Sequence, residues 1–291
     1  MAANTLWTIK KLIDWTTQYF KNHHIEDPRL DTELLLAHVL KKQRIFLYTD
    51  FDEMVNPDEL AQFKSYIQKR VSGISTSAII GERDFMGLTF KVNENVLIPR
   101  PDTETWLEKV IQYHRGDQNL QIADLGTGSG AILLSFLYYC KEAKGVGVDI
   151  SPKALEVAKE NGETFHLTDR VSWIEGDYIE ALPQDVLYDG ILTNPPYIPH
   201  DDIKGLSTEV RHEPMLALDG GEDGLTFYHR LAEKGAAHLK PGGFLAMEFG
   251  IHQWEDILHL FKETGQFEDF EVIKDYGGIE RAIYCKKMAS D

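Results

Sequence analysis

The segment DLGTGSGAI, residues 124–132, lies where one apolar run ends and a second apolar run with helical spacing begins. Its glycines, Gly126, Gly128 and Gly130, let the chain turn sharply from a strand into a helix and leave room for a ligand against the backbone. With Ala131 the segment also satisfies the GxGxxG/A pattern of dinucleotide-binding proteins. The turn therefore predicts a nucleotide-type cofactor at the end of a strand, without deciding which one.

On either side of this turn, predicted strands alternate with predicted helices. Strands are expected at residues 120–125, 145–150, 171–176, 188–193 and 244–249, with two more closing the chain, and helices at residues 103–114, 130–143, 151–165, 225–239 and 252–265. This alternation predicts an α/β fold with a mostly parallel sheet covered on both faces. Ligands of such folds bind beyond the carboxyl ends of the strands.

Of the carboxylates at two strand ends, one fits either cofactor and the other favours S-adenosylmethionine over a dinucleotide. Asp149 ends the second strand, where it could accept hydrogen bonds from both hydroxyls of an adenosine ribose in either cofactor. Asp124, directly before the glycine turn, would repel a pyrophosphate but could hold the ammonium group that only S-adenosylmethionine carries. After the third strand, Asp177 offers a polar partner and Tyr178 an aromatic wall for the adenine, with core packing as the alternative role of Tyr178.

The fourth strand leads into Asn194, Pro195, Pro196 and Tyr197, at the same edge of the sheet as the glycine turn. The prolines fix φ and lack N–H donors, so the backbone is stiff and its carbonyl groups are left to accept hydrogen bonds. The Asn194 side chain accepts and donates, which complements a planar group bearing an NH2 and an acceptor, and Tyr197 adds an aromatic face. Adenine, cytosine and glutamine all carry such a group. A rigid turn without function is the alternative.

Two regions precede the α/β domain. Residues 1–75 contain three segments with helical spacing, the last of them capped by Asn56, and predict a small helical domain. This domain lacks a nucleophile, metal cluster or phosphate loop, which suggests a role in substrate recognition. Residues 76–105 contain short apolar runs broken by Gly and Asn and predict a β-hairpin linker. The catalytic domain is expected over residues 106–291.

Composition and charge limit the partners. The 291 residues carry a formal net charge of −17, which argues against a broad nucleic-acid surface because affinity for phosphates is built from Lys and Arg. No apolar run approaches the roughly 18 residues of a membrane span, and the first residues lack the layout of a secretory signal. Cys140 and Cys285 form no CxxC pattern and the histidines form no HExxH motif. We expect a cytoplasmic monomer without metal, membrane contact or direct contact with nucleic acid.

The motifs together resemble one family. DLGTGSG, GVDIS and NPPY are similar to class I S-adenosylmethionine-dependent methyltransferases that methylate a planar nitrogen. LIPRPDTE, EPMLALDGGEDGL and LKPGGFLAMEFG extend the resemblance over nearly the whole chain to the release factor glutamine methyltransferases, the PrmC/HemK family. This resemblance implies a Rossmann-like seven-stranded sheet with an N-terminal helical domain and a hairpin linker. It also implies methylation, in translation termination, of the glutamine of the Gly-Gly-Gln motif in class 1 peptide-chain release factors.

The residues and the resemblance together define a candidate site. The cofactor, S-adenosyl-L-methionine, which becomes S-adenosyl-L-homocysteine, is expected to bind Asp124, Gly126, Thr127, Gly128, Ser129, Gly130, Asp149, Asp177, Tyr178 and Asn194. The catalytic residues are expected to be Asn194, Pro195 and Tyr197, which with Pro196 would bind the substrate amide. The chain departs from the family in SGISTSAII, which lacks the usual Pro before the linker, and in GGIERAI, which lacks the typical Arg after Gly-Gly.

Other functions stay open at this point. A glutamine methyltransferase acting on a ribosomal protein would share NPPY and the linker pattern. An N6-adenine DNA methyltransferase would need a basic groove and usually a target-recognition insertion. The acidic composition does not provide the groove, and the chain has no spare length for the insertion. A binding module without catalysis would be expected to have lost a motif residue, and none is lost. Arg100, Asp102, Glu104 and the segment 213–225 could contact substrate, or form interdomain salt bridges and a plain loop.

Overall fold

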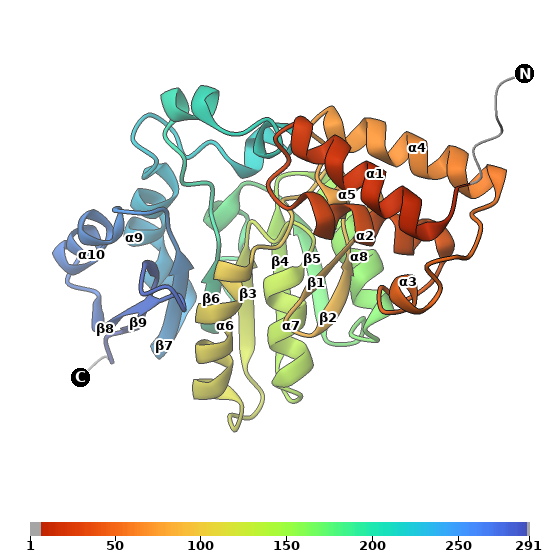
Figure 1. Cartoon of the computed structure of the whole chain (residues 1–291). Helices are drawn as coiled ribbons and strands as arrows, with labels where there is room; N and C mark the ends of the chain where they lie inside the picture. The colour runs from red at the N-terminus through yellow and green to blue at the C-terminus, as the bar shows by residue number, and fades with distance from the viewer. Residues whose placement is uncertain (1–6, 290–291) are drawn as a thin grey trace, which may run out of the picture. The chain divides into compact units, whose positions relative to one another are not determined.

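The computed structural model of the chain describes residues 7–289 (Figure 1) and contains two compact units, with the boundary between Gly81 and Glu82. The boundary differs from the one predicted at residue 76. Residues Thr76–Ile80 form a short helix, α5, which Ser75 caps by accepting a 3.2 Å hydrogen bond from the Ala78 N–H. Gly81 ends this helix with φ 85°. The hairpin that follows therefore belongs to the second unit.

The first unit is helical, as predicted. Its elements are α1 (Ile9–Asn22), α2 (Pro28–Leu40), α3 (Phe46–Thr49), α4 (Pro57–Val71) and α5. Asn56 caps α4 as expected: its Oδ1 accepts from the Glu59 N–H at 2.9 Å, and the Glu59 carboxylate accepts from the Asn56 N–H at 3.0 Å. Buried apolar side chains of α1, α2 and α4 form the core of the unit. The first of the three segments with helical spacing, TLWTIKKLIDWTTQYF, begins with Thr5 and Leu6, which lie outside the described residues.

The second unit has a seven-stranded sheet in the order β5-β4-β3-β6-β7-β9-β8, and only β9 runs antiparallel to its neighbours. The strands are β3 (Gln121–Leu125), β4 (Lys144–Asp149), β5 (Val171–Glu175), β6 (Tyr188–Thr193), β7 (Leu239–Glu248), β8 (Phe267–Lys274) and β9 (Glu280–Lys287). A separate antiparallel hairpin consists of β1 (Glu82–Phe85) and β2 (Leu88–Lys91). The predicted mostly parallel sheet is confirmed.

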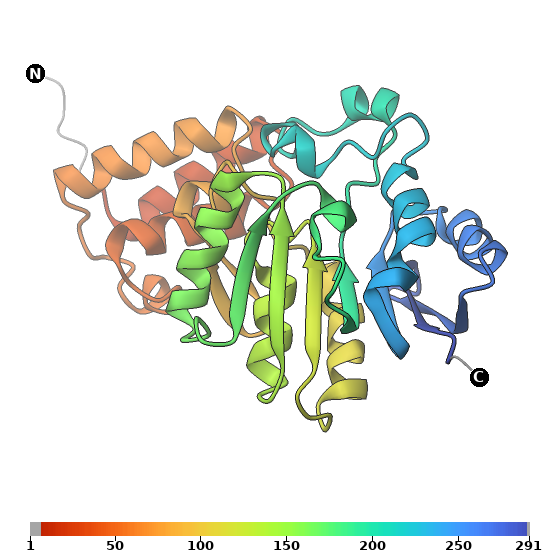
Figure 2. The ribbon, with the colours of Figure 1, turned by 180° about the vertical axis from the view of Figure 1, so that it is seen from behind.

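Helices cover both faces of the sheet. They are α6 (Pro101–His114), α7 (Ala131–Tyr139), α8 (Pro152–Thr164), α9 (Thr226–His238) and α10 (Trp254–Glu263). Helices α6 and α7 lie on one face of the sheet (Figure 1), and α9 and α10 lie on the other, which faces the viewer in Figure 2. Buried side chains of each pair of helices form a core with residues of the sheet. None of the helices within residues 7–289 is long and apolar enough to cross a bilayer.

The strand order reverses between β3 and β6. From β3 the chain first adds β4 and β5 on one side, then returns to add β6 and β7 on the other. At such a reversal the connections leave in opposite directions, which opens a crevice at the carboxyl ends of the two strands. The glycine turn follows β3 and Asn194 follows β6, so both predicted motifs lie at this crevice.

Candidate active site

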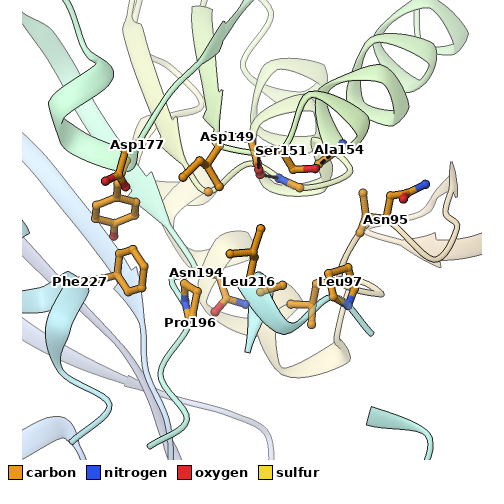
Figure 3. A pocket seen from close by; sticks show the side chains of 17 residues that line it. Asn95, Leu97, Asp149, Ser151, Ala154, Asp177, Asn194, Pro196, Leu216 and Phe227 are labelled. Carbon is orange, nitrogen blue, oxygen red and sulfur yellow. Dashed lines mark hydrogen bonds between the residues drawn. The ribbon is translucent and has the colours of Figure 1, made fainter. Parts of the chain in front are cut away.

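A cavity lies at the reversal between β3 and β6 (Figure 3). Its lining consists of Asn95, Val96, Leu97, Gly126, Gly128, Asp149, Ile150, Ser151, Ala154, Asp177, Tyr178, Asn194, Pro196, Pro214, Leu216, Ala217 and Phe227. The structure thus brings together predicted residues from the ends of β3, β4, β5 and β6. In Figure 3, Asp149 lies across the open space from Asn194.

The glycine turn and Asp149 form one wall and fit a nucleoside. Gly126 and Gly128 adopt φ of 70° and 55°, and a Cβ at either position would meet no other atom within 4 Å, so the backbone is open to a ligand. The Asp149 carboxylate accepts the Gly128 N–H at 2.8 Å on Oδ2 and the Ser151 N–H at 2.9 Å on Oδ1. Burial raises the pKa of Asp149, and these N–H donors oppose the rise. Each oxygen keeps a lone pair for a ribose hydroxyl.

An aromatic wall follows β5. Tyr178 has φ 56°, and its buried ring contacts Phe227 edge to face at a centroid distance of 4.9 Å. The Tyr178 hydroxyl hydrogen-bonds to Thr193 at 3.0 Å, so the ring takes part both in the cavity wall and in the core. Asp177 is held by Arg230 at 2.9 Å and remains exposed. Phe227 was not predicted, because it belongs to the apolar pattern of a helix.

Several predicted cofactor residues do not line this cavity. Thr127 and Ser129 line a second, smaller cavity, which shares Gly126, Gly128, Leu97 and Asn194 with the first. Gly130 lies in neither lining; a Cβ there would approach Leu134 Cδ1 at 2.9 Å and Trp173 at 3.2 Å, so this glycine permits close packing of α7 on the sheet. The cofactor contacts assigned to these residues stay predictions.

Asp124 is completely buried and lines neither cavity. Its Oδ2 accepts the Thr127 hydroxyl at 2.6 Å, whereas Oδ1 has no hydrogen-bond partner among residues 7–289. Burial raises the pKa of Asp124 to about 7, and the Thr127 hydroxyl opposes that rise. An unpartnered buried carboxyl oxygen is the kind of atom that an ammonium group would satisfy.

Asp124 should make the stability of the ligand-free protein fall with rising pH. Its folded pKa, about 7, lies above the ordinary value of roughly 4 for an Asp, so between these limits the folded state holds a proton that the unfolded chain releases. Asp124→Asn removes this titration. We expect the variant to gain about 1 kcal/mol relative to the parent for each pH unit between 5 and 7. Urea unfolding of both proteins at four pH values measures the difference, and a pH-independent difference would contradict the assignment.

The residues of the turn after β6 differ in whether they line the cavity or pack inside the protein. Pro196 lines the cavity, Pro195 is buried, and the Tyr197 ring packs with the apolar side chains of the α9 and α10 face. Burial raises the pKa of the Tyr197 phenol. The backbone carbonyl of Tyr197 accepts a hydrogen bond from the side-chain N–H of Gln253 at 3.0 Å. Pro195 and Tyr197 are therefore outside the lining, and their predicted contact with a substrate amide remains a prediction.

The glycine-rich part of the segment 213–225 packs directly against this turn. The Gly220 N–H donates to the Ile198 carbonyl at 2.9 Å. A Cβ on Gly220 would lie 2.8 Å from Tyr197 Cα, and one on Gly224 would lie 2.4 Å from the Tyr197 carbonyl oxygen. Only glycine permits such close approach of two backbones. This part is thus a clamp on the turn, and Pro214, Leu216 and Ala217 complete the cavity wall.

The charged residues of LIPRPDTE bond within the second unit. Arg100 pairs with Glu213 at 2.7 Å, and Asp102 pairs with Arg281 at 2.9 Å. Burial raises the pKa of Glu213, and Arg100 opposes that rise. These pairs join the start of α6 to the segment 213–225 and to β9, all within the second unit. They are therefore not the interdomain salt bridges that were one of the two alternatives for these residues. Glu104 lines a separate groove.

The hairpin contributes to the site through Asn161 of α8. The Asn161 side-chain amide donates to the Lys91 carbonyl at 3.0 Å and to the Ser129 carbonyl at 2.9 Å. Its oxygen accepts the Lys91 N–H at 2.8 Å. One buried side chain therefore joins β2 to the glycine turn, and the residues after β2, 95–97, form part of the cavity wall.

The comparisons with known proteins identify the family of the chain. Residues 11–81 match the PrmC N-terminal domain family, and residues 104–213 match the methyltransferase small domain family. The chain is 40% identical over 279 residues to the release factor glutamine methyltransferase of Geobacter sulfurreducens, covering 96% of each chain. It is 36% identical over 289 residues to that of Rhodopirellula baltica, covering 98% of each. The chain belongs to the release factor glutamine methyltransferase family. The family predicted from the motifs is confirmed, and with it a dependence on S-adenosylmethionine.

Solved structures confirm the class I methyltransferase fold of this family member. A 16S rRNA methyltransferase of Thermus thermophilus, RsmC, in complex with AdoMet and guanosine, has a TM-score of 0.52 at 21% identity, covering 71% of this chain and 49% of that one. Methanocaldococcus jannaschii Trm5 in complex with adenosine has a TM-score of 0.51 at 18% identity, covering 72% and 56%. At these identities the likeness concerns the fold alone.

Sequence reasoning missed a buried network behind Asn194. Glu248, the last residue of β7, accepts the Thr103 hydroxyl at 2.6 Å and the Trp106 indole N–H at 2.8 Å, both on Oε2. Thr103 in turn lies 3.4 Å from Asn194 Nδ2. One signal was available: Glu248 is an acid in the otherwise apolar run FLAMEF, where an unpaired charge would be costly.

Proposed function

We propose that this protein transfers a methyl group from S-adenosyl-L-methionine to the side-chain amide N5 of the glutamine in the Gly-Gly-Gln motif of class 1 release factors. The observation that carries the proposal is that Asn194 lines the same cavity as Gly126, Gly128 and Asp149. A carboxylate suited to a ribose and an amide suited to a planar NH2 group thus face one space. Family membership supports the same activity.

Asn194 and Pro195 would orient the substrate. An amide nitrogen is a weak nucleophile because its lone pair is delocalised into the carbonyl. Asn194 Oδ1 and the Pro195 carbonyl accept its two N–H groups, which aims the nitrogen and favours the positive charge that develops on it. For Pro195 the proposal concerns the carbonyl group, since a proline ring carries no polar atom and its nitrogen has no N–H.

The rest of the chain's contribution is positioning. When bound, S-adenosylmethionine supplies a methyl group attached to a sulfonium, whose sulfur is a good leaving group because it departs as a neutral thioether. The substrate nitrogen would gain the new N–C bond as the methyl C–S bond breaks, and S-adenosylhomocysteine would leave as a neutral thioether. The nitrogen would then release one proton to water, since within residues 7–289 no histidine or lysine lines the cavity to take it. Gly220 and Gly224 hold the turn, and Asp149 would hold the ribose.

The substrate assay distinguishes the candidate substrates. The protein is incubated with radiolabelled S-adenosylmethionine and, separately, a class 1 release factor, the same factor with the motif glutamine replaced by alanine, ribosomal proteins and DNA. Label is expected in the intact release factor and absent from its Gln-to-Ala variant. Label in a ribosomal protein alone, or in DNA alone, would overturn the proposed substrate.

We also propose a monomer that works in the cytoplasm, where release factors act in translation. The formal net charge of −17 favours repulsion between copies of the chain. Sedimentation equilibrium should then give a mass near 33.2 kDa. A mass near twice this value at micromolar concentration would contradict the monomer.

A further inference from the structure

We infer that Thr103 and Glu248 set which end of the Asn194 side-chain amide faces the substrate. This inference rests on the proposed function, in which Asn194 Oδ1 accepts the substrate N–H. The oxygen and nitrogen of an Asn amide have nearly the same shape, so packing alone does not choose between two orientations related by a flip. A hydrogen-bond partner of defined polarity has to make that choice.

The strand register brings the three residues together. In the parallel pair β6 and β7, Thr193 lies opposite Met247, so Asn194 and Glu248 occupy the next matching positions. Two residues earlier, Leu192 and Ala246 belong to the core cluster under α6, and side chains two apart share a face of a sheet. Asn194 and Glu248 thus face α6, which supplies Thr103 and Trp106.

Trp106 fixes which atoms donate and which accept in the hydrogen bonds of this network. An indole N–H can only donate, so Glu248 Oε2, at 2.8 Å from it, is an acceptor. The same oxygen lies 2.6 Å from Thr103 Oγ1, so the Thr103 hydroxyl donates its single proton there. Burial raises the pKa of Glu248, and its two donors oppose the rise. Both donors contact Oε2, so these donor and acceptor roles stay the same when the Glu248 carboxyl group is protonated on Oε1.

Thr103 is therefore left with only lone pairs toward Asn194. A donor is required opposite it, and Asn194 Nδ2 lies there at 3.4 Å. The flipped amide would place Asn194 Oδ1 against an oxygen that has no proton to give. It would also direct an NH2 group at the substrate NH2, so that two donors would face each other. Thr103 and Glu248 are positioning residues, which act through Asn194.

Thr103→Val tests this role by removing the hydroxyl with little change of shape. We expect kcat to fall about five- to tenfold, the worth of one hydrogen bond, while the Kd of the cofactor stays within about twofold. Thr103→Ser, which keeps the hydroxyl, should restore kcat to within about twofold. Thr105→Val is the matched control: it removes a hydroxyl from the same helix that donates to the Asp102 carbonyl at 2.6 Å and not to this network.

A double-mutant cycle separates positioning from general damage. Asp at position 194 has no amide to orient, so Thr103→Val should change kcat less than about twofold in the Asn194→Asp background. If the Thr103→Val protein does not fold, Glu248 offers the same contrast: Glu248→Gln keeps an acceptor for both donors and should retain most activity, whereas Glu248→Met should lose it.

The possible outcomes are distinct. Equal kcat for the Thr103→Val and Thr105→Val proteins, or an equal loss from Thr103→Val in both backgrounds, would overturn the inference and leave the proposed function intact. Full activity of the Asn194→Ala protein would instead overturn the proposed role of Asn194, and this inference with it.

Discussion

Asn194→Ala is expected to lower kcat for release factor methylation by about 10²- to 10³-fold. The variant removes an oriented acceptor in the cavity wall, and a preorganised group of this kind contributes most when charge develops in the transition state. The Kd of S-adenosylmethionine should change by no more than about fivefold, since at most one hydrogen bond to the cofactor is lost. Single-turnover methylation and calorimetric titration measure the two quantities separately.

Gln118→Ala is the matched control for this variant. It removes an exposed amide before β3, at the opposite edge of the sheet from the cavity, and should leave kcat within about twofold. Thermal unfolding of both variants shows whether either loses stability. An Asn194→Ala protein that methylates the release factor at the parental rate would refute the assigned role.

Gly224→Ala should lower kcat about hundredfold by displacing the turn after β6. Gly224 has φ 77°, and a Cβ there would lie 2.4 Å from the Tyr197 carbonyl oxygen and 2.7 Å from Gln253 Nε2. Both atoms belong to the hydrogen bond that holds the turn. The Gln253 side chain can rotate away, but the Tyr197 carbonyl is backbone, so relieving its contact with the new Cβ requires the turn that carries Asn194 to shift. A displacement of about 1 Å of a positioning group can cost roughly 10² in rate. Steady-state kinetics with release factor as the varied substrate measures the loss.

Gly242→Ala separates this clash from backbone strain. Gly242 has φ 74°, so alanine there carries a similar conformational cost of about 1 kcal/mol, but its Cβ would meet no atom within 4 Å. We expect Gly242→Ala to lower the melting temperature by a few degrees and to keep kcat within about twofold. Equal kcat values for the two variants would show that the clamp does not position the turn.

Local patterns were enough to predict the parts of the site that lie at strand ends. Gly126, Gly128, Asp149 and Asn194 lie at the end of a predicted strand or within three residues after it, and the alternation of strands and helices brings such ends to one edge. The fold followed from the same periodicity. The short helix α5 was missed because its apolar residues, read without their cap, resemble the start of a strand.

The direction of individual side chains could not be predicted in the same way. Asp124 lies two residues before the lining residue Gly126, and Tyr197 directly follows the lining residue Pro196. The structure nevertheless buries Asp124 completely and packs the ring of Tyr197 against the core. Thr103 and Glu248 are 145 residues apart, so no local pattern relates them. Which partner Arg100 finds likewise depends on packing between distant segments.

The hydrogen bonds of Asn161 determine at which residue a shortened version of the protein should begin. A fragment that begins at residue 106, where the catalytic domain was expected to start, would lose β1, β2 and the wall formed by residues 95–97. It would also leave Asn161 without two of its three bonds, next to the Ser129 carbonyl that it holds. The smallest fragment worth expressing as a cofactor-binding module therefore starts at Glu82, and any fusion or split site belongs before that residue.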